Sequence, residues 1–369
     1  MLTIEALRRF AVSRNFPGPT SLRIALQRMG FVQADPIRAP ARAQDLILRQ
    51  RVNNYHAGDL ERSYTKLDIE EDFFINYGYV TTTLHRLMHP RSNSSELIDD
   101  VWKALPLAQR RRAKRILDFV NERGTVHPRE VDEYFSHGKI TNYWGGSSNA
   151  TTHLLDALHY HGMLRIVRRD KGIRLYGARN PAAAPADPNE RDLRLDALAD
   201  VILSIYAPLP SATLWFYLRR LRYAVPHWEK ALKGMLDRAK QRLPHEQVDK
   251  QDWYWPVGEK IPRRSVSDTV RLLAPFDPLV HDRARFELLW GWSYRFEAYT
   301  PAAKRKLGYY AMPMLWRDEI VGWANLSVKE GRLHSEIGFA GTPVREKTFK
   351  RELDRELNSI SAFLRLQSR

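Results

Sequence analysis

The stretch LRIVRRDKGIRLY, at residues 164–176, has the pattern of a two-stranded hairpin. Apolar and basic residues alternate on both sides of Asp170-Lys171-Gly172, which is typical of a tight turn. Three segments with helical spacing precede it: the first begins at Arg110, the second at His127-Pro128, and the third extends from Thr151 to His161. Three helices followed by a hairpin is the order of a winged helix.

Similar patterns occur on both sides of this unit. Upstream, helices are predicted for Thr3 to Arg14, with Thr3 as the N-cap, and for Thr20 to Met29, before an extended run from Phe31 to Pro36. Downstream, a linker rich in proline and alanine is predicted at 180–189. Helical segments at 193–205, 211–221 and 228–238 and a strand at 253–256 follow it. The order of helices and then strands therefore recurs along the chain.

The C-terminal part is rich in aromatic residues and predicts strands at 294–299, 309–315 and 319–326, followed by an amphipathic helix at 347–366. We therefore predict an α+β fold of tandem winged-helix domains with a C-terminal β-rich module. The predicted boundaries are 1–105 for an N-terminal helix-turn-helix or winged-helix domain, 106–180 and 190–262 for two further winged helices, and 263–369 for the β-rich module with its terminal helix.

Composition restricts the class of function. The chain of 369 residues has 59 Lys and Arg against 43 Asp and Glu, a formal net charge of +16, and 43% hydrophobic residues, which suits a folded protein that binds a polyanion such as nucleic acid. The absence of cysteine excludes disulfides, thiolate zinc fingers, iron–sulfur clusters and cysteine nucleophiles. The charged N-terminus does not resemble a signal peptide, and no apolar run approaches the ~18 residues of a membrane span. A cytoplasmic, nucleoid-associated protein is expected.

Gln33 and Asp35 are the strongest candidates for catalysis. They stand two residues apart in the extended run, so their side chains are expected on the same face, and Pro36 disfavours a helical conformation at Asp35. A carboxylate beside an amide can orient or deprotonate a water. The alternative is an aspartate that caps a local turn before proline.

Basic residues surround this pair and recur later in the chain. The predicted DNA contacts are Arg38, Arg42, Arg49, Arg51, Arg110, Arg111, Arg112 and Trp144. For each arginine the alternative is a solvated surface position, and Trp144 either stacks on a base or packs the wing of the second domain.

Other constellations are weaker. Asp277, Asp282 and Glu287 could form a nuclease site, but the prolines on both sides of Asp277 favour structural turns. His85 and His89 are spaced i, i+4 on a predicted helix, yet no third ligand follows at metal spacing. We therefore predict no metal site and no cofactor.

Three segments together carry a resemblance to a known family. The runs at 30–45, 275–283 and 299–310 resemble the AlkZ/YcaQ family of winged-helix DNA glycosylases, and the resemblance extends over nearly the whole chain. It implies three tandem winged helices around a basic DNA channel and a bacterial base-excision-repair enzyme that removes alkylated purines and unhooks interstrand crosslinks. The family's catalytic element is glutamine, a hydrophobic residue, and then aspartate or glutamine; Gln33 and Asp35 match the aspartate form.

The resemblance further implies an enzyme that needs no cofactor and acts on double-stranded DNA carrying alkylated purines or interstrand crosslinks. Because no lysine lies in the motif, a monofunctional hydrolase is expected, and a monomer is favoured. The competing hypothesis is a non-catalytic winged-helix protein, such as a transcription regulator, which composition and helix order support equally well. Metal dependence of any activity would distinguish the nuclease hypothesis.

Overall fold

The computed structural model describes residues 2–89, 107–135, 139–141, 147–179, 187–261 and 267–366. The chain divides into two compact units, of which the first comprises Met1–Leu60, Leu198–Leu218 and Leu236–Arg369 and the second Glu61–Ala197 and Arg219–Met235. No helix among the described residues combines the length and the hydropathy that crossing a bilayer requires. The domain boundaries expected from the sequence remain a prediction.

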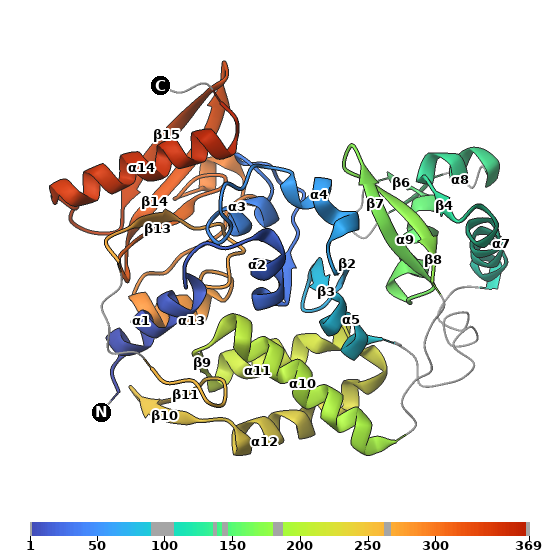
Figure 1. Ribbon diagram of the computed structural model, residues 1–369, viewed down its shortest axis with the longest axis horizontal. Coiled ribbons are helices and arrows are strands. Elements are labelled where there is room, and N and C mark those ends of the chain that lie inside the picture. Colours follow the sequence, from blue (N-terminus) through green and yellow to red (C-terminus); the bar gives the residue numbers. More distant parts are fainter. Residues whose placement is uncertain are drawn as a thin grey trace. The chain divides into compact units, whose positions relative to one another are not determined.

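The helices and strands are as follows (Figure 1). The α-helices are α1 Ile4–Asn15, α2 Leu22–Met29, α3 Ala43–Arg49, α4 Asp59–Ser63, α5 Thr82–Met88, α7 Leu107–Arg123, α8 Pro128–Phe135, α9 Ala150–Tyr160, α10 Pro188–Tyr206, α11 Ser211–Arg220, α12 Leu232–Arg242, α13 Arg283–Trp290 and α14 Lys347–Phe363. The strands are β1 Phe31–Gln33, β2 Ile69–Phe73, β3 Tyr77–Thr81, β4 Thr125–Val126, β5 Lys139–Thr141, β6 Ser147–Asn149, β7 Leu164–Asp170, β8 Ile173–Ala178, β9 Leu209–Pro210, β10 His245–Val248, β11 Gln251–Tyr254, β12 Val270–Leu272, β13 Met312–Trp316, β14 Glu319–Lys329 and β15 Arg332–Phe339.

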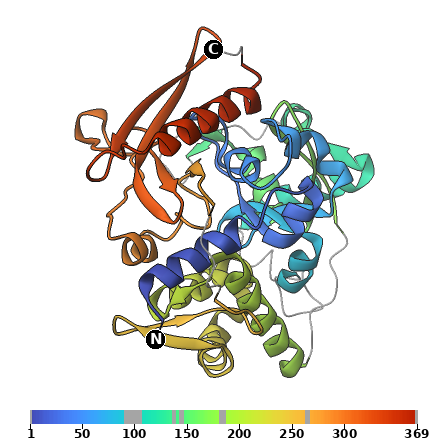
Figure 2. The same cartoon turned by 60° about the vertical axis from the view of Figure 1, so that its left-hand side comes forward.

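The first unit is organised around the antiparallel sheet β12–β13–β14–β15. Helix α14 packs on this sheet, where Phe349 contacts Trp316 with ring centroids 5.6 Å apart. In Figure 2 the red helix α14 again lies along the orange and red strands. Buried side chains of α1, α13 and the sheet, including Leu7, Phe286 and Leu315, form one hydrophobic core. This core holds in place the loops that connect α13 to β13.

The second unit contains the hairpin that the sequence predicts. Strands β7 and β8 pair, β4 adds to β8, and the three-stranded sheet packs with α7, α8 and α9 around buried Ile116, Leu155 and Leu164. Lys171 and Gly172 have φ angles of 48° and 86°, as a two-residue hairpin turn requires. The order of three helices and a hairpin is therefore confirmed for 107–178, with the residues of 136–138 and 142–146 outside the described part.

Strand β2 of the second unit buries three consecutive carboxylates, Glu70, Glu71 and Asp72. Each has a cationic or imidazole partner, because burying an unpaired charge is very costly. Glu71 accepts bonds of 2.8 and 2.6 Å from Arg169 of β7, and Glu70 forms an ion pair of 2.7 Å with Arg165. These pairs join β2 to the winged-helix sheet.

The mixed architecture confirms the predicted α+β fold class. One local prediction is wrong: residues 294–299 do not form a strand. Tyr294 is buried and donates from its hydroxyl to Ala311 O at 2.7 Å, whereas Tyr299 is 79% exposed. An irregular segment that buries one ring and exposes another can therefore carry a residue pattern similar to that of a strand.

Candidate active site

The Gln33/Asp35 motif lies just after a well-defined helix stop. Gly30 ends α2 with a φ of 67°, β1 follows, and Gln33 is its last, buried residue. Asp35 is beyond the strand, so strand alternation does not set the direction of its side chain. Instead Asp35 Oδ1 accepts from Ile37 N at 2.9 Å, an Asx turn that fixes the carboxylate locally.

Gln44 of α3 forms a hydrogen bond to the same turn. Asp35 N donates to Oε1 of the buried Gln44 at 3.4 Å. The backbone on both sides of the carboxylate is therefore held, as a catalytic group requires. The turn interpretation and the catalytic interpretation of Asp35 are compatible, because the turn engages one carboxylate oxygen only.

Asp35 is half-buried, and burial raises the pKa of its carboxyl, with the Ile37 N–H acting in the opposite direction. Across the described residues Asp35 forms no ion pair. A desolvated carboxylate without a neutralising cation is a stronger base and a better partner for a positive charge than a solvated one.

We expect the raised pKa of Asp35 to be visible in the pH profile of the reaction. The ionised form is the base, so activity is lost as pH falls through this pKa, and the acid limb is expected above the value of about 3.9 of an ordinary aspartate. Bound DNA, a polyanion, shifts the limb in the same direction. Single-turnover rates measured against pH test this, and a midpoint at or below the ordinary value would contradict it.

Two tyrosines lie within electrostatic range of Asp35. Burial raises the pKa of both Tyr299 and Tyr310, and the negative charge of Asp35 raises each pKa further. The ring of Phe296 connects them, with centroids 6.1 Å from Tyr299 and 5.4 Å from Tyr310. Tyr299 is 79% exposed, whereas Tyr310 is 2% exposed and its hydroxyl has no hydrogen-bond partner among the described residues. Asp35 therefore faces an aromatic wall with one accessible ring.

The loop that carries this wall is fixed by a buried carboxylate. Glu297 Oε2 accepts from the backbone N–H groups of Lys306, Leu307 and Gly308 at 2.9, 2.8 and 3.3 Å. Burial opposes ionisation of Glu297, but the three N–H groups outweigh it and lower its pKa. Gly308 has a φ of 116°, and a Cβ there would overlap the side chain of Asn325. The loop is thus positioned by specific bonds.

A groove of about 790 Å³ opens beside the motif. It is lined by residues 38–40 and 308–310 and by β14 and β15, and Arg38 and Lys329 bring positive charge to it. Neither cation has an ion-pair partner within the described ranges. A smaller cavity of about 250 Å³ is lined by Arg14, Arg28 and other residues. Neither Gln33 nor Asp35 lines either space, but the groove begins at Arg38, three residues after Asp35, and includes Tyr310, so it is the space closer to the motif along the chain.

The structure separates the arginines that the sequence groups together. Arg38 is exposed and Arg42 half-buried. Arg51 is 6% exposed and forms an ion pair with the buried Asp277, with bonds of 2.8 and 3.1 Å, and Arg49 is paired with Glu356. The expectation that Arg49 and Arg51 contact phosphate is therefore corrected, because both guanidinium groups neutralise buried carboxylates.

The remaining predicted DNA contacts belong to the second unit. Arg111 and Arg112 are exposed on α7 and Arg110 is partly exposed. Trp144 lies outside the described residues. Direct contact of these four with DNA remains a prediction.

The nuclease constellation does not form a site. Asp277 is held by Arg51 and accepts from Leu279 N at 3.1 Å, and Asp282 caps α13 by accepting from Arg285 N. Glu287 is exposed on the same helix. The structural interpretation is confirmed for Asp277 and Asp282.

A metal-type cluster occurs elsewhere, in the second unit. His85 and His89 meet Asp72, a third potential ligand that precedes them in the chain. The sequence predicted no third ligand among the residues that follow the histidines, whereas Asp72 precedes them. The spacing along the chain therefore does not exclude a metal site here.

Several residues of the candidate active site were not predicted, among them Gln44, Glu297 and Tyr299. Gln44 and Tyr299 belong to runs that carry the family resemblance, and that signal could have marked them. Glu297 lies outside those runs and accepts from backbone N–H groups, for which no residue pattern is diagnostic.

Comparisons with known proteins identify the family and the fold. A family model described as DNA glycosylase AlkZ-like matches residues 26–363 of the chain. Among solved structures, the chain is similar to the DNA glycosylase AlkZ of Streptomyces sahachiroi, with 13% sequence identity and a TM-score of 0.63. That similarity covers 98% of this chain and 96% of the other, and it shows a shared fold.

Proposed function

Because the chain belongs to the AlkZ-like DNA glycosylase family, which its residues 26–363 match, we propose that it removes alkylated purines from duplex DNA, including those that form interstrand crosslinks. Membership of this family identifies the protein as a DNA-repair enzyme that hydrolyses N-glycosyl bonds. The observation that supports the proposal for the substrate is the half-buried carboxylate of Asp35 beside the exposed ring of Tyr299. Both an anion and a π face attract a cationic base.

The chemistry assigns a role to each part. A purine alkylated on a ring nitrogen is positively charged and leaves readily, so the sugar is where assistance is needed. The carboxylate of Asp35 stabilises oxocarbenium character at the anomeric carbon and accepts a proton from the attacking water. Gln33 holds that water. A crosslinked base stays tethered to the opposite strand, and the open groove beside the motif suits such a lesion better than a deep pocket.

We further propose that the enzyme is monofunctional, because the segment 30–45 contains no lysine. Water is then the nucleophile, and the product is an abasic site in an unbroken strand. Borohydride treatment during turnover distinguishes the mechanisms, since a trapped protein–DNA adduct would reveal a Schiff base and overturn this part of the proposal.

The test of the function is release of an N7-alkylguanine from duplex DNA with a single defined lesion, in EDTA. The products are analysed both directly and after alkali, and a nitrogen-mustard crosslink is tested beside the monoadduct. Base release followed by alkali-dependent cleavage supports the proposal. Binding without release from either substrate would contradict it and favour a non-catalytic DNA-binding protein.

Arg38 is proposed as a phosphate contact. We expect Arg38→Ala to weaken binding to undamaged and damaged duplex equally and to reduce the slope of log K against log salt by about 1. The reason is that one exposed, unpaired cation releases one counterion. Fluorescence anisotropy at several salt concentrations measures the slope. An unchanged slope would show that Arg38 does not contact a DNA phosphate.

Tyr299 is proposed as the ring that contacts the damaged base. We expect Tyr299→Ala to weaken binding of the lesion about tenfold or more relative to undamaged DNA, and Tyr299→Phe to retain binding, because stacking requires the ring and not the hydroxyl. Competition binding with both duplexes measures the ratio. Equal losses for Ala and Phe would show that the hydroxyl matters instead.

Arg42, Arg110, Arg111, Arg112 and Trp144 remain proposed DNA contacts, and a monomer remains the proposed state. Each arginine is open to the same salt-slope measurement as Arg38. Sedimentation of the protein with and without duplex DNA tests the oligomeric state.

A further inference from the structure

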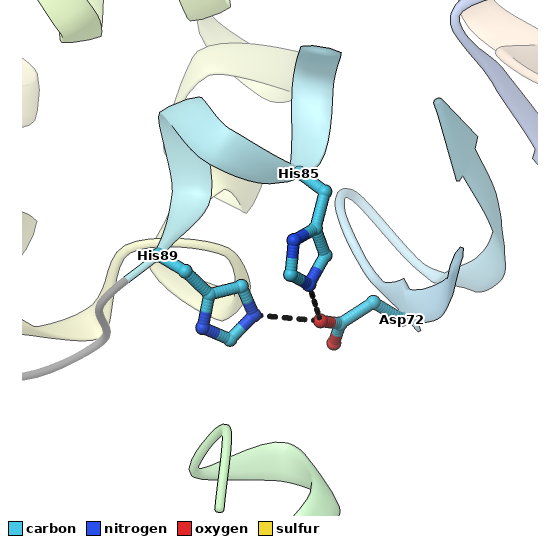
Figure 3. Close-up of side chains that lie close together, drawn as sticks. All are labelled: Asp72, His85 and His89. Atoms are coloured by element: carbon cyan, nitrogen blue, oxygen red, sulfur yellow. Dashed lines mark hydrogen bonds and ion pairs between the residues drawn. The ribbon is translucent and has the colours of Figure 1, made fainter. Parts of the chain in front are cut away.

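One oxygen and two nitrogen atoms converge in the second unit, which contains neither Gln33 nor Asp35. Figure 3 shows Asp72 of β2 facing His85 of α5 and His89, which immediately follows that helix. Asp72 Oδ2 lies 2.7 Å from His89 Nε2 and 3.2 Å from His85 Nε2. In the described part of the chain, these side chains form the one group of three or more metal-type ligands whose donor atoms lie within 4.8 Å of one another. We propose that this group binds a divalent transition-metal ion of the zinc type.

The spacing of the donor atoms suits such an ion. Zinc binds imidazole nitrogen and carboxylate oxygen at about 2.0–2.2 Å, which places neighbouring tetrahedral ligands ~3.4 Å apart. The observed separations of 2.7 and 3.2 Å need only small outward movements. Two imidazoles with one carboxylate favour zinc, cobalt or nickel over calcium or magnesium, which prefer oxygen ligands only.

Neighbouring contacts orient the ligands, as in established metal sites. Asp72 Oδ1 accepts from Phe73 N at 2.7 Å, which turns Oδ2 toward the two rings. The opposite edge of the His89 ring packs closely against Gly162. A Cβ added to this glycine would lie only 2.9 Å from Nδ1 of His89, so no larger residue fits there without displacing the ring. The three side chains are 2–12% exposed, so water competes weakly for their donor atoms.

A guanidinium group faces the same nitrogen. Arg179 Nη1 lies 2.5 Å from His85 Nε2, and Arg179 Nη2 donates to Glu70 at 3.2 Å. His85 Nε2 carries either a proton for Asp72 or a lone pair for Arg179, and it cannot satisfy both. With a metal ion present, both imidazole lone pairs and Asp72 Oδ2 face the ion while Arg179 retains Glu70. The arginine and the ion therefore compete for one position.

The role of the site follows from its place in the fold. The ion connects β2 to the C-terminal end of α5, and a fourth ligand is left to water. Such a link stabilises the second unit and takes no part in glycosidic bond cleavage, so the inference is independent of the proposed function.

The test uses the tag-free full-length protein, stripped with a chelator and titrated with Co²⁺, whose visible absorption reports imidazole coordination. Zn²⁺ is then added in competition, and the melting temperature is measured with each metal. The variants are His89→Ala and the isosteric Asp72→Asn, with His153→Ala, an exposed histidine of α9, as the matched control. Far-UV circular dichroism verifies that each variant is folded.

We expect about one Co²⁺ per chain, displaced by Zn²⁺, with a rise in melting temperature. His89→Ala and Asp72→Asn weaken binding by more than about 10-fold, whereas His153→Ala does not. Arg179→Met strengthens binding, because it removes the competing cation. The proposal is overturned if the wild type and Arg179→Met both fail to bind Co²⁺, or if folded His89→Ala and Asp72→Asn bind as the wild type does. In that case the cluster is a hydrogen-bond network only.

Discussion

Replacing Asp35 by Asn is expected to lower the single-turnover rate of base release by about 1000-fold while leaving DNA affinity within a fewfold of wild type. Asn keeps the shape of the side chain and can still accept from Ile37 N, so the turn is preserved. What is lost is the negative charge, and with it the stabilisation of positive charge at the sugar and the acceptor for the water proton.

The same substitution is expected to raise the stability of the protein, although it lowers the rate. The pKa of Asp35 is raised in the folded protein by burial, so the folded state favours the protonated form, and ionisation at neutral pH works against folding. Asn carries no charge, and Asp35→Asn is therefore expected to melt at a higher temperature than wild type at pH 7 and at nearly the same temperature at pH 3. Loss of activity with gain of stability is typical of a catalytic position.

Asp268→Asn is the matched control, since Asp268 is an exposed carboxylate of the same unit that forms an ion pair with Arg317. It is expected to change neither the rate nor the affinity. Retention of activity within about 10-fold of wild type by Asp35→Asn would remove Asp35 from the chemistry. A loss of DNA affinity equal to the loss of rate would instead assign Asp35 a role in binding.

Much of the local structure could be predicted because its causes are local. Thr3 caps α1 by accepting from Ala6 N, and Gly124 ends α7 with a φ of 76°. The hairpin after α9 follows from alternation around a turn whose residues tolerate positive φ. In each case the residues that decide the structure are within a few positions of one another, so the pattern is visible in the sequence.

The site could be predicted only in part, because its remaining contacts join distant segments. Arg38 and Arg51 look alike in the sequence, but Arg51 has its partner 226 residues away at Asp277 whereas Arg38 is exposed. Asp72 meets His85 and His89 only because β2 lies beside the end of α5. Composition indicates that an arginine needs a partner, and only the folded chain decides whether that partner is a carboxylate or a phosphate.

Breaking the Arg51–Asp277 pair is expected to destabilise the first unit by about 3–5 kcal/mol. The side chains are 7% and 1% exposed and share two hydrogen bonds, and Arg51 also donates to Ile47 O and contacts the ring of Phe16. Arg51→Met leaves a buried carboxylate without its cation. Urea unfolding is the measurement, and Arg38→Ala, at an exposed position, is the control expected to change stability by less than about 0.5 kcal/mol.

A double-mutant cycle separates the pair from its surroundings. Asp277→Asn leaves the buried cation of Arg51 uncompensated, whereas the double variant buries neither charge and is expected to lose less than the sum of the single losses, with a coupling of about 1–3 kcal/mol. Folded Arg51→Met is expected to bind duplex DNA as wild type does, because its guanidinium is enclosed by protein. If Arg51→Met instead has normal stability, weaker DNA binding and an altered salt slope, Arg51 contacts DNA. The experiment thus decides between a carboxylate and a phosphate as the partner of this arginine.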